Sequence, residues 1–173
     1  IEKVKKLSKK RFIIDKLPMN FRWIGFIVKA FPEAKIIHLQ RNPMAICWSN
    51  YKINFPDPGM DFSLSQKDTA NYYVLYDDLM KFWSNKLKNK IININYEKFV
   101  NDFENETHIL ADKLGITWEE NLKNYSKNSR PVQTASLLQV RGNIKKNTSE
   151  EWKKYKDHLK IMRETLDSAK IKY

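Results

Sequence analysis

Hydrophobic and polar positions along this chain form short blocks of two kinds. A short apolar run of the kind found in strands that are covered on both faces occurs at residues 36–39. Residues 12–14 also predict a short buried strand, and residues 91–96 predict another strand. The segments between and after them repeat apolar residues every three or four positions, as amphipathic helices do. Strands and helices that alternate at these lengths predict a three-layer α/β fold with a mainly parallel sheet.

The predicted helices have recognisable boundaries. Ser65 with Asp68 resembles a capping box at the start of the longest helix. One face of this helix is expected to lie in the core, and its apolar stripe consists of Tyr72, Leu75, Tyr76, Leu79, Phe82 and Trp83. We expect the other helices over residues 21–31, 43–49, 97–114 and 149–166. The proline-rich segment 55–59 and the polar segment 126–136 predict loops.

The most informative block is the run from Lys35 to Pro43, in which a buried strand stops at Arg41 and turns at once into a helix. Asn42 is suited to be the N-cap and Pro43 the first helical residue, so we expect exposed backbone N–H groups beside Arg41. A guanidinium next to a helix start predicts a phosphate site, to which Ser49 could add a hydroxyl. The alternative is an arginine that caps its own strand or pairs with a carboxylate.

Polar side chains follow all three predicted strands. Lys16, Arg41 and Tyr96 come at or just after the carboxyl ends of these strands. Ligands of parallel sheets bind at that edge. The sequence therefore predicts that these three residues converge on a binding site.

Composition narrows the class of protein. The 173 residues are 42% hydrophobic, which is enough for one domain with a core over 1–173. With 32 Lys and Arg against 20 Asp and Glu, the formal charge is +12, so the surface should attract nucleotides or other polyanions. We find no run of about 18 apolar residues that would cross a membrane.

The single cysteine and the three histidines bear on the redox compartment and on metal binding. Cys47 is the only cysteine, so no intramolecular disulfide forms, and a reducing compartment such as the cytoplasm is expected. The three histidines and Cys47 lack the spacing of metal ligands, so we expect no metal site. His38 is interpreted as a satisfied strand histidine.

Several sequence blocks occur together and in a characteristic order. They are Asp15-Lys16-Leu17-Pro18, Lys35-Ile36-Ile37-His38, Arg41-Asn42-Pro43 with Ser49, Tyr96-Glu97, Thr134-Ala135-Ser136 and Gln139-Val140-Arg141. With these blocks the chain resembles the sulfotransferase family, especially protein-tyrosine and bacterial sulfotransferase domains. The resemblance implies a P-loop NTPase-like sulfotransferase architecture.

The resemblance also implies a reaction and its cofactor. The family transfers a sulfonate group from 3′-phosphoadenosine 5′-phosphosulfate to a hydroxyl or amine acceptor, leaving adenosine 3′,5′-bisphosphate. By resemblance, Arg41 and Ser49 bind the 3′-phosphate, and Tyr96 lies by the adenosine. Ser136 and Arg141 belong to a late segment that folds over the nucleotide.

Lys16 is the catalytic residue that the resemblance implies, because it would sit beside the transferred sulfonate. Negative charge grows on the bridging oxygen of the leaving group, and a cation there stabilises the transition state. The acceptor itself is not identified by any motif.

The chain also departs from the family pattern. The first strand and the phosphate-cradling loop of the family would precede Ile1, and the four glycines form no such loop. We therefore expect the C-terminal portion of a sulfotransferase domain, incomplete at its N-terminus and potentially inactive alone. The absent strand would lie between the strands of Lys16 and Arg41, leaving a gap in the sheet.

Two other function classes stay open at this point. A basic nucleic-acid-binding domain would explain the charge of +12, but RNP-like, zinc-finger and basic-region signatures are absent. A nucleotide kinase-like protein would share the sheet topology and bind ATP with Mg²⁺.

Overall fold

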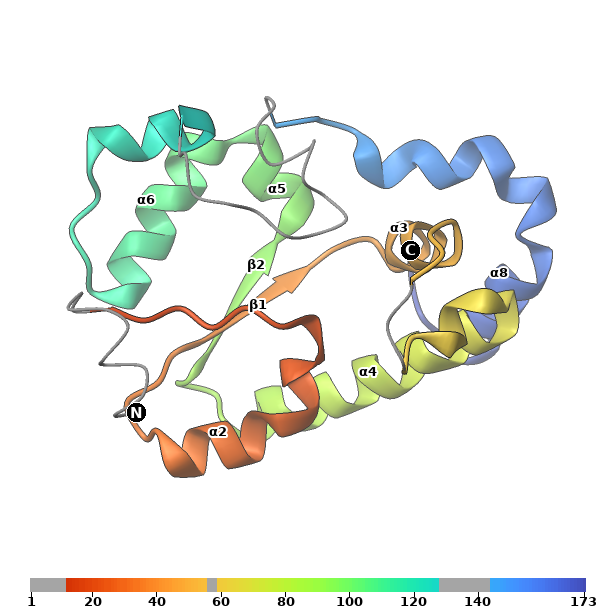
Figure 1. Cartoon of the computed structure of the whole chain (residues 1–173), viewed down its shortest axis with the longest axis horizontal. Helices are drawn as coiled ribbons and strands as arrows, with labels where there is room; N and C mark the ends of the chain where they lie inside the picture. The colour runs from red at the N-terminus through yellow and green to blue at the C-terminus, as the bar shows by residue number, and fades with distance from the viewer. Residues whose placement is uncertain (1–11, 56–58, 128–143) are drawn as a thin grey trace.

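The computed structural model describes residues 12–55, 59–127 and 144–173 (Figure 1). In this part of the chain the sheet consists of two parallel strands, β1 (Ile36–Gln40) and β2 (Ile91–Asn95). Ile36 lies opposite Ile91, and Gln40 lies opposite Asn95, so the carboxyl ends of both strands meet at one edge. This parallel arrangement agrees with the α/β prediction.

Helices lie on both sides of this sheet, as Figure 1 shows. On one side are α2 (Ile24–Ala30), which follows the 3₁₀ helix η1 (Pro18–Trp23), and the long α4 (Gln66–Lys86). On the other side are α5 (Tyr96–Asn101) and α6 (Phe103–Leu114). The remaining elements are α3 (Pro43–Tyr51), η2 (Asp61–Leu64), η3 (Glu120–Lys127), η4 (Thr148–His158) and α8 (Lys160–Ser168).

The strand predicted at residues 12–14 is wrong. Residues 12–17 have no regular secondary structure, and the Ile14 side chain is 88% exposed. A three-residue run gains little without a neighbouring strand to take its backbone hydrogen bonds, and within the described residues β1 pairs only with β2. The other edge of β1 is left open there, and Ile37 and Leu39 remain about half exposed.

Two predicted helix starts are confirmed. The Asn42 side chain accepts a hydrogen bond from the Ala45 N–H at 2.9 Å, which makes it the N-cap of α3. Ser65 caps α4 by accepting from the Asp68 N–H at 3.3 Å. Each cap satisfies a backbone donor that the helix itself leaves unpaired.

Other helix predictions need correction. The helix predicted over 97–114 is split at Asp102 into α5 and α6, and α6 ends at Gly115, which has the left-handed backbone (φ 68°) favoured by glycine. The predicted helix 149–166 is instead η4 followed by α8. In α4, Leu75 and Phe82 are exposed, so only part of its apolar stripe faces the core.

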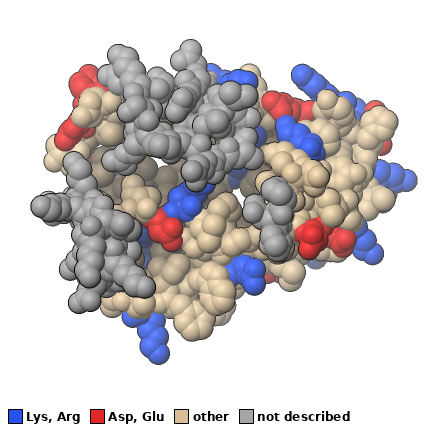
Figure 2. All heavy atoms as spheres, viewed as in Figure 1, with Lys and Arg blue, Asp and Glu red and all other residues tan. Residues whose placement is uncertain are grey.

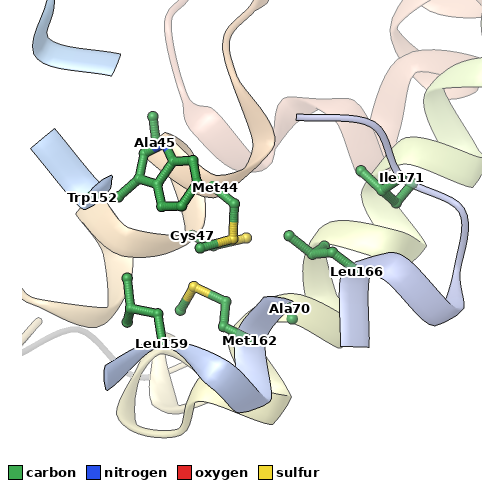
Figure 3. Close-up of a cluster of buried hydrophobic side chains, with 9 residues drawn as sticks. All are labelled: Met44, Ala45, Cys47, Ala70, Trp152, Leu159, Met162, Leu166 and Ile171. Atoms are coloured by element: carbon green, nitrogen blue, oxygen red, sulfur yellow. The ribbon is translucent and has the colours of Figure 1, made fainter. Parts of the chain in front are cut away.

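The main hydrophobic core joins the C-terminal segment to α3 and α4. Figure 3 shows side chains of α8, including Met162 and Leu166, converging with those of α3 on one space. The cluster consists of Met44, Ala45, Cys47, Ala70, Trp152, Leu159, Met162, Leu166 and Ile171. Because burial of apolar surface stabilises the fold, this cluster fastens η4 and α8 beside the start of α3.

Candidate functional site

Arg41 lies at the turn between β1 and α3, where the sequence predicts a binding site. Its Nε donates a hydrogen bond to Ser149 Oγ at 3.0 Å, and its Nη2 donates to Thr148 Oγ1 at 3.2 Å. The guanidinium also lies over the Tyr96 ring, 4.8 Å from the ring centroid. Three contacts from two other parts of the chain thus fix the orientation of this cation.

The Arg41 donors are only partly used. A guanidinium has five N–H groups, and hydrogen bonds within the described residues engage one on Nε and one on Nη2. Both partners are hydroxyls, so in this part of the chain Arg41 is not the ion-paired arginine of the alternative interpretation. The other N–H groups have the planar geometry that suits an oxyanion.

Glu97 organises the same region from the start of α5. Its Oε1 accepts hydrogen bonds from the Asn42 backbone N–H at 3.0 Å and from Ser149 Oγ at 2.6 Å. Partial burial acts to raise the pKa of Glu97, but these two hydrogen bonds and the nearby Arg41 charge outweigh it. The pKa of Glu97 is therefore lowered, and the carboxylate is ionised at neutral pH.

The start of α3 differs from the sequence interpretation in one respect. Two of the N–H groups at this helix start are taken by the protein, because Asn42 N–H donates to Glu97 and Ala45 N–H donates to the Asn42 side chain. Pro43 has no N–H group. The Glu97 carboxylate thus occupies the anion position at this helix start, and Arg41 is left as the main donor for an external anion.

An open hollow of about 440 Å³ lies against Arg41. That volume falls in the range of about 300–1,000 Å³ found for ligand sites. Its lining includes Gln40 and Asn95 at the strand ends, and Ser149 and Lys172 from the C-terminal segment. The hollow therefore lies at the edge of the sheet where ligands of α/β proteins bind.

The structure brings some predicted site residues together and not others. Arg41 and Tyr96 are in contact. Lys16 lies in the exposed segment 12–17, and Ser49 is partly buried on α3; neither lines the hollow. Ser136 and Arg141 lie outside the described residues.

Sequence reasoning missed three residues of this region. Thr148 and Ser149 hold Arg41, and Glu97 holds Ser149. Glu97 stands in the Tyr96-Glu97 block that contributes to the family resemblance and directly follows a strand end, but neither signal gives it a role in the site. Thr148 and Ser149 stand at the predicted start of the helix over 149–166, but nothing in the sequence links them to Arg41, because that contact depends on the fold.

His38 serves a different part of the molecule. Its Nδ1 is 2.8 Å from Asn93 Oδ1 on β2, and its Nε2 makes a short hydrogen bond with the Tyr76 hydroxyl on α4. Burial lowers the pKa of His38, although the hydrogen bond that its Nδ1–H donates to Asn93 and the nearby charge of Asp77 act to raise it. Both ring nitrogens are thus occupied, in agreement with the interpretation of a satisfied strand histidine.

On the face shown in Figure 2, the Lys and Arg side chains of the described residues are interspersed with Asp and Glu side chains and form no single basic patch. Among the described residues, no three His, Cys, Asp or Glu side chains are placed to hold a metal ion. The helices in the same residues are too short or too polar to cross a membrane.

Comparisons with known proteins give a family for most of the chain and a similar protein. Residues 1–120 match the model of a family described as the sulfotransferase family. An uncharacterized protein of Aquifex aeolicus (strain VF5) is 32% identical over 172 residues, which cover 98% of this chain and 23% of that protein. The chain thus spans about a quarter of the length of this relative.

Proposed function

The chain belongs to the sulfotransferase family, and from that premise we propose that it binds 3′-phosphoadenosine 5′-phosphosulfate in the hollow beside Arg41. The sulfonate group would pass to a hydroxyl or amine acceptor, and adenosine 3′,5′-bisphosphate would be the product. The proposal includes the P-loop NTPase-like architecture of the family. We also propose a reducing compartment such as the cytoplasm, because the chain has one cysteine.

The observation that carries this proposal is the fixed orientation of Arg41. Hydroxyls at 3.0 and 3.2 Å and the Tyr96 ring hold the guanidinium beside the hollow, with N–H groups to spare among the described contacts. A pre-oriented guanidinium binds a phosphate with little loss of side-chain entropy. The 3′-phosphate is therefore the group that we assign to Arg41.

The remaining cofactor contacts are proposed from the family pattern. Ser49 would contribute a second hydroxyl to the 3′-phosphate; since it does not line the hollow, this contact is proposed from the family pattern alone. Tyr96 would lie beside the adenosine. Ser136 and Arg141 would belong to the segment that covers the nucleotide.

Lys16 is proposed as the catalytic cation. In the transfer step the bond between sulfur and the bridging phosphate oxygen breaks, and a bond forms between sulfur and the acceptor oxygen or nitrogen. The acceptor proton leaves to a base, and the electron pair of the broken bond stays on the bridging oxygen. An ammonium group near that oxygen would stabilise its growing charge.

Nucleotide binding by the chain tests the proposal directly. At one hundred times its Kd, a ligand stabilises the folded state by about 2.7 kcal/mol, which raises the Tm of a domain of this size by about 5–10 °C. We expect this shift with adenosine 3′,5′-bisphosphate at concentrations where AMP, which lacks the 3′-phosphate, gives little. Equal shifts with both nucleotides would contradict the assignment.

A variant pair places the effect at Arg41. Arg41→Ala should abolish the difference between the two nucleotides. Lys113→Ala, on the exposed surface of α6, removes one positive charge elsewhere and should retain the difference. A shift with ATP and Mg²⁺ alone would favour the kinase-like alternative, and salt-sensitive binding of unrelated oligonucleotides would favour the nucleic-acid alternative.

A further inference from the structure

A chain of hydrogen bonds connects the start of α3 to Arg41 through residues far apart in the sequence. The Asn42 N–H and the Ser149 hydroxyl both donate to Glu97 Oε1, at 3.0 and 2.6 Å. The Ser149 oxygen in turn accepts from Arg41 Nε at 3.0 Å. Ser149, the middle residue of this hydrogen-bond relay, is only 4% exposed, whereas Arg41 and Glu97 are partly buried beside the hollow.

Each polar atom in this relay has a defined direction. Because the Ser149 hydroxyl donates its one hydrogen to Glu97, its lone pairs face Arg41, where they accept from Nε. Removing the Glu97 acceptor would free the hydroxyl to rotate and would leave its hydrogen without an acceptor. The Ser149 lone pairs would then no longer be directed at Arg41 Nε, and among the described contacts the guanidinium would be held by Thr148 and the Tyr96 ring alone.

The position of Glu97 also determines what it does not do. It accepts from Asn42 and Ser149, and within the described residues it forms no ion pair with Arg41. The Nη groups of Arg41 that have no partner in this part of the chain are therefore not covered by the carboxylate. An incoming phosphate can bind them without displacing Glu97.

We propose that Glu97 is a positioning residue for the anion site, and that it acts through Ser149 to orient the Arg41 guanidinium toward the hollow. This inference rests on the proposed function, because the anion in question is the 3′-phosphate of the nucleotide.

The test measures Kd values for adenosine 3′,5′-bisphosphate and for AMP by calorimetry with the full chain. Glu97→Ala removes the acceptor, and Glu97→Gln keeps an acceptor oxygen but removes the charge. Ser149→Ala breaks the relay at its next member. Glu150→Gln removes one negative charge that also lines the hollow and calibrates the effect of charge alone.

We expect Glu97→Ala and Ser149→Ala each to weaken bisphosphate binding by about tenfold, the value of one hydrogen bond to a charged group. AMP binding should be unchanged, and Glu97→Gln should restore bisphosphate binding to within about threefold of the wild type. Unfolding in urea identifies any variant that fails to fold. If Glu97→Ala does not fold, the bisphosphate affinities of Glu97→Gln and Ser149→Ala test the inference.

Three results would contradict the positioning role of Glu97. Tighter bisphosphate binding by Glu97→Ala, after the Glu150→Gln calibration, would make Glu97 merely a repelling charge and overturn the inference. Unchanged binding by both alanine variants, or equal weakness of Glu97→Gln and Glu97→Ala, would also overturn it. If instead the wild type does not distinguish the two nucleotides, the proposed function fails before the inference is tested.

Discussion

Truncation of Leu166 to alanine tests whether the core cluster holds the C-terminal segment in place. Leu166 is fully buried among residues of the cluster that joins α3, α4 and α8. The substitution removes three buried carbon atoms, each worth about 0.8 kcal/mol of transfer free energy. The cavity left behind adds to this loss, so we expect the free energy of unfolding to fall by about 3–4 kcal/mol.

Urea unfolding followed by tryptophan fluorescence measures this loss. Ile161→Ala provides the matched control, because Ile161 lies in the same helix with 54% of its surface exposed; we expect a loss below about 1 kcal/mol. Because α8 supports the segment that carries Thr148 and Ser149, Leu166→Ala should also weaken nucleotide binding. A loss below about 1 kcal/mol for Leu166→Ala, or equal losses for both variants, would refute the role assigned to this core.

Three further measurements address single residues. The folded-state pKa of Glu97 is lowered, so its ionised carboxylate should stabilise the fold fully above the unfolded-state pKa, and this stabilisation should be lost as the pH falls through the folded-state pKa. Glu97→Gln should flatten this part of the plot of unfolding free energy against pH, and an unaltered plot would contradict the role of the carboxylate. In Gly25→Ala the new Cβ would lie 2.6 Å from Trp83 Cη2, so we expect the free energy of unfolding, measured in urea, to fall by about 1–3 kcal/mol. A variant as stable as the wild type would show that the Trp83 ring moves aside without cost. Burial raises the pKa of the Cys47 thiol to about 12, so a thiol reagent should modify it only after unfolding, and rapid modification of the native protein would disprove its burial.

The parts of the fold that depend on neighbouring residues could be predicted from the sequence. The start of α3 at Asn42 and Pro43, and the start of α4 at Ser65, follow from capping chemistry within four residues. The contact between Arg41 and Tyr96 follows from the rule that parallel strands end at the same edge.

The parts that depend on distant partners could not be predicted. The run at 12–14 has the composition of a strand, but a strand also requires a neighbour to bond its backbone. The helix start beside Arg41 appeared open to an external anion because nothing local indicates that Glu97 fills it. Thr148 and Ser149 likewise acquire their role only when the C-terminal segment packs on α3.

The two hydrogen bonds of Arg41 join positions 107 and 108 residues apart in the sequence. During synthesis, β1 and α3 therefore leave the ribosome long before the hydroxyls that orient their arginine exist. Contacts of such long range form late in folding because a large loop must close first. The orientation of Arg41 described here therefore requires that residues 148 and 149 have been synthesised, and any truncated product that stops before residue 148 has the arginine without the two hydroxyls that orient it.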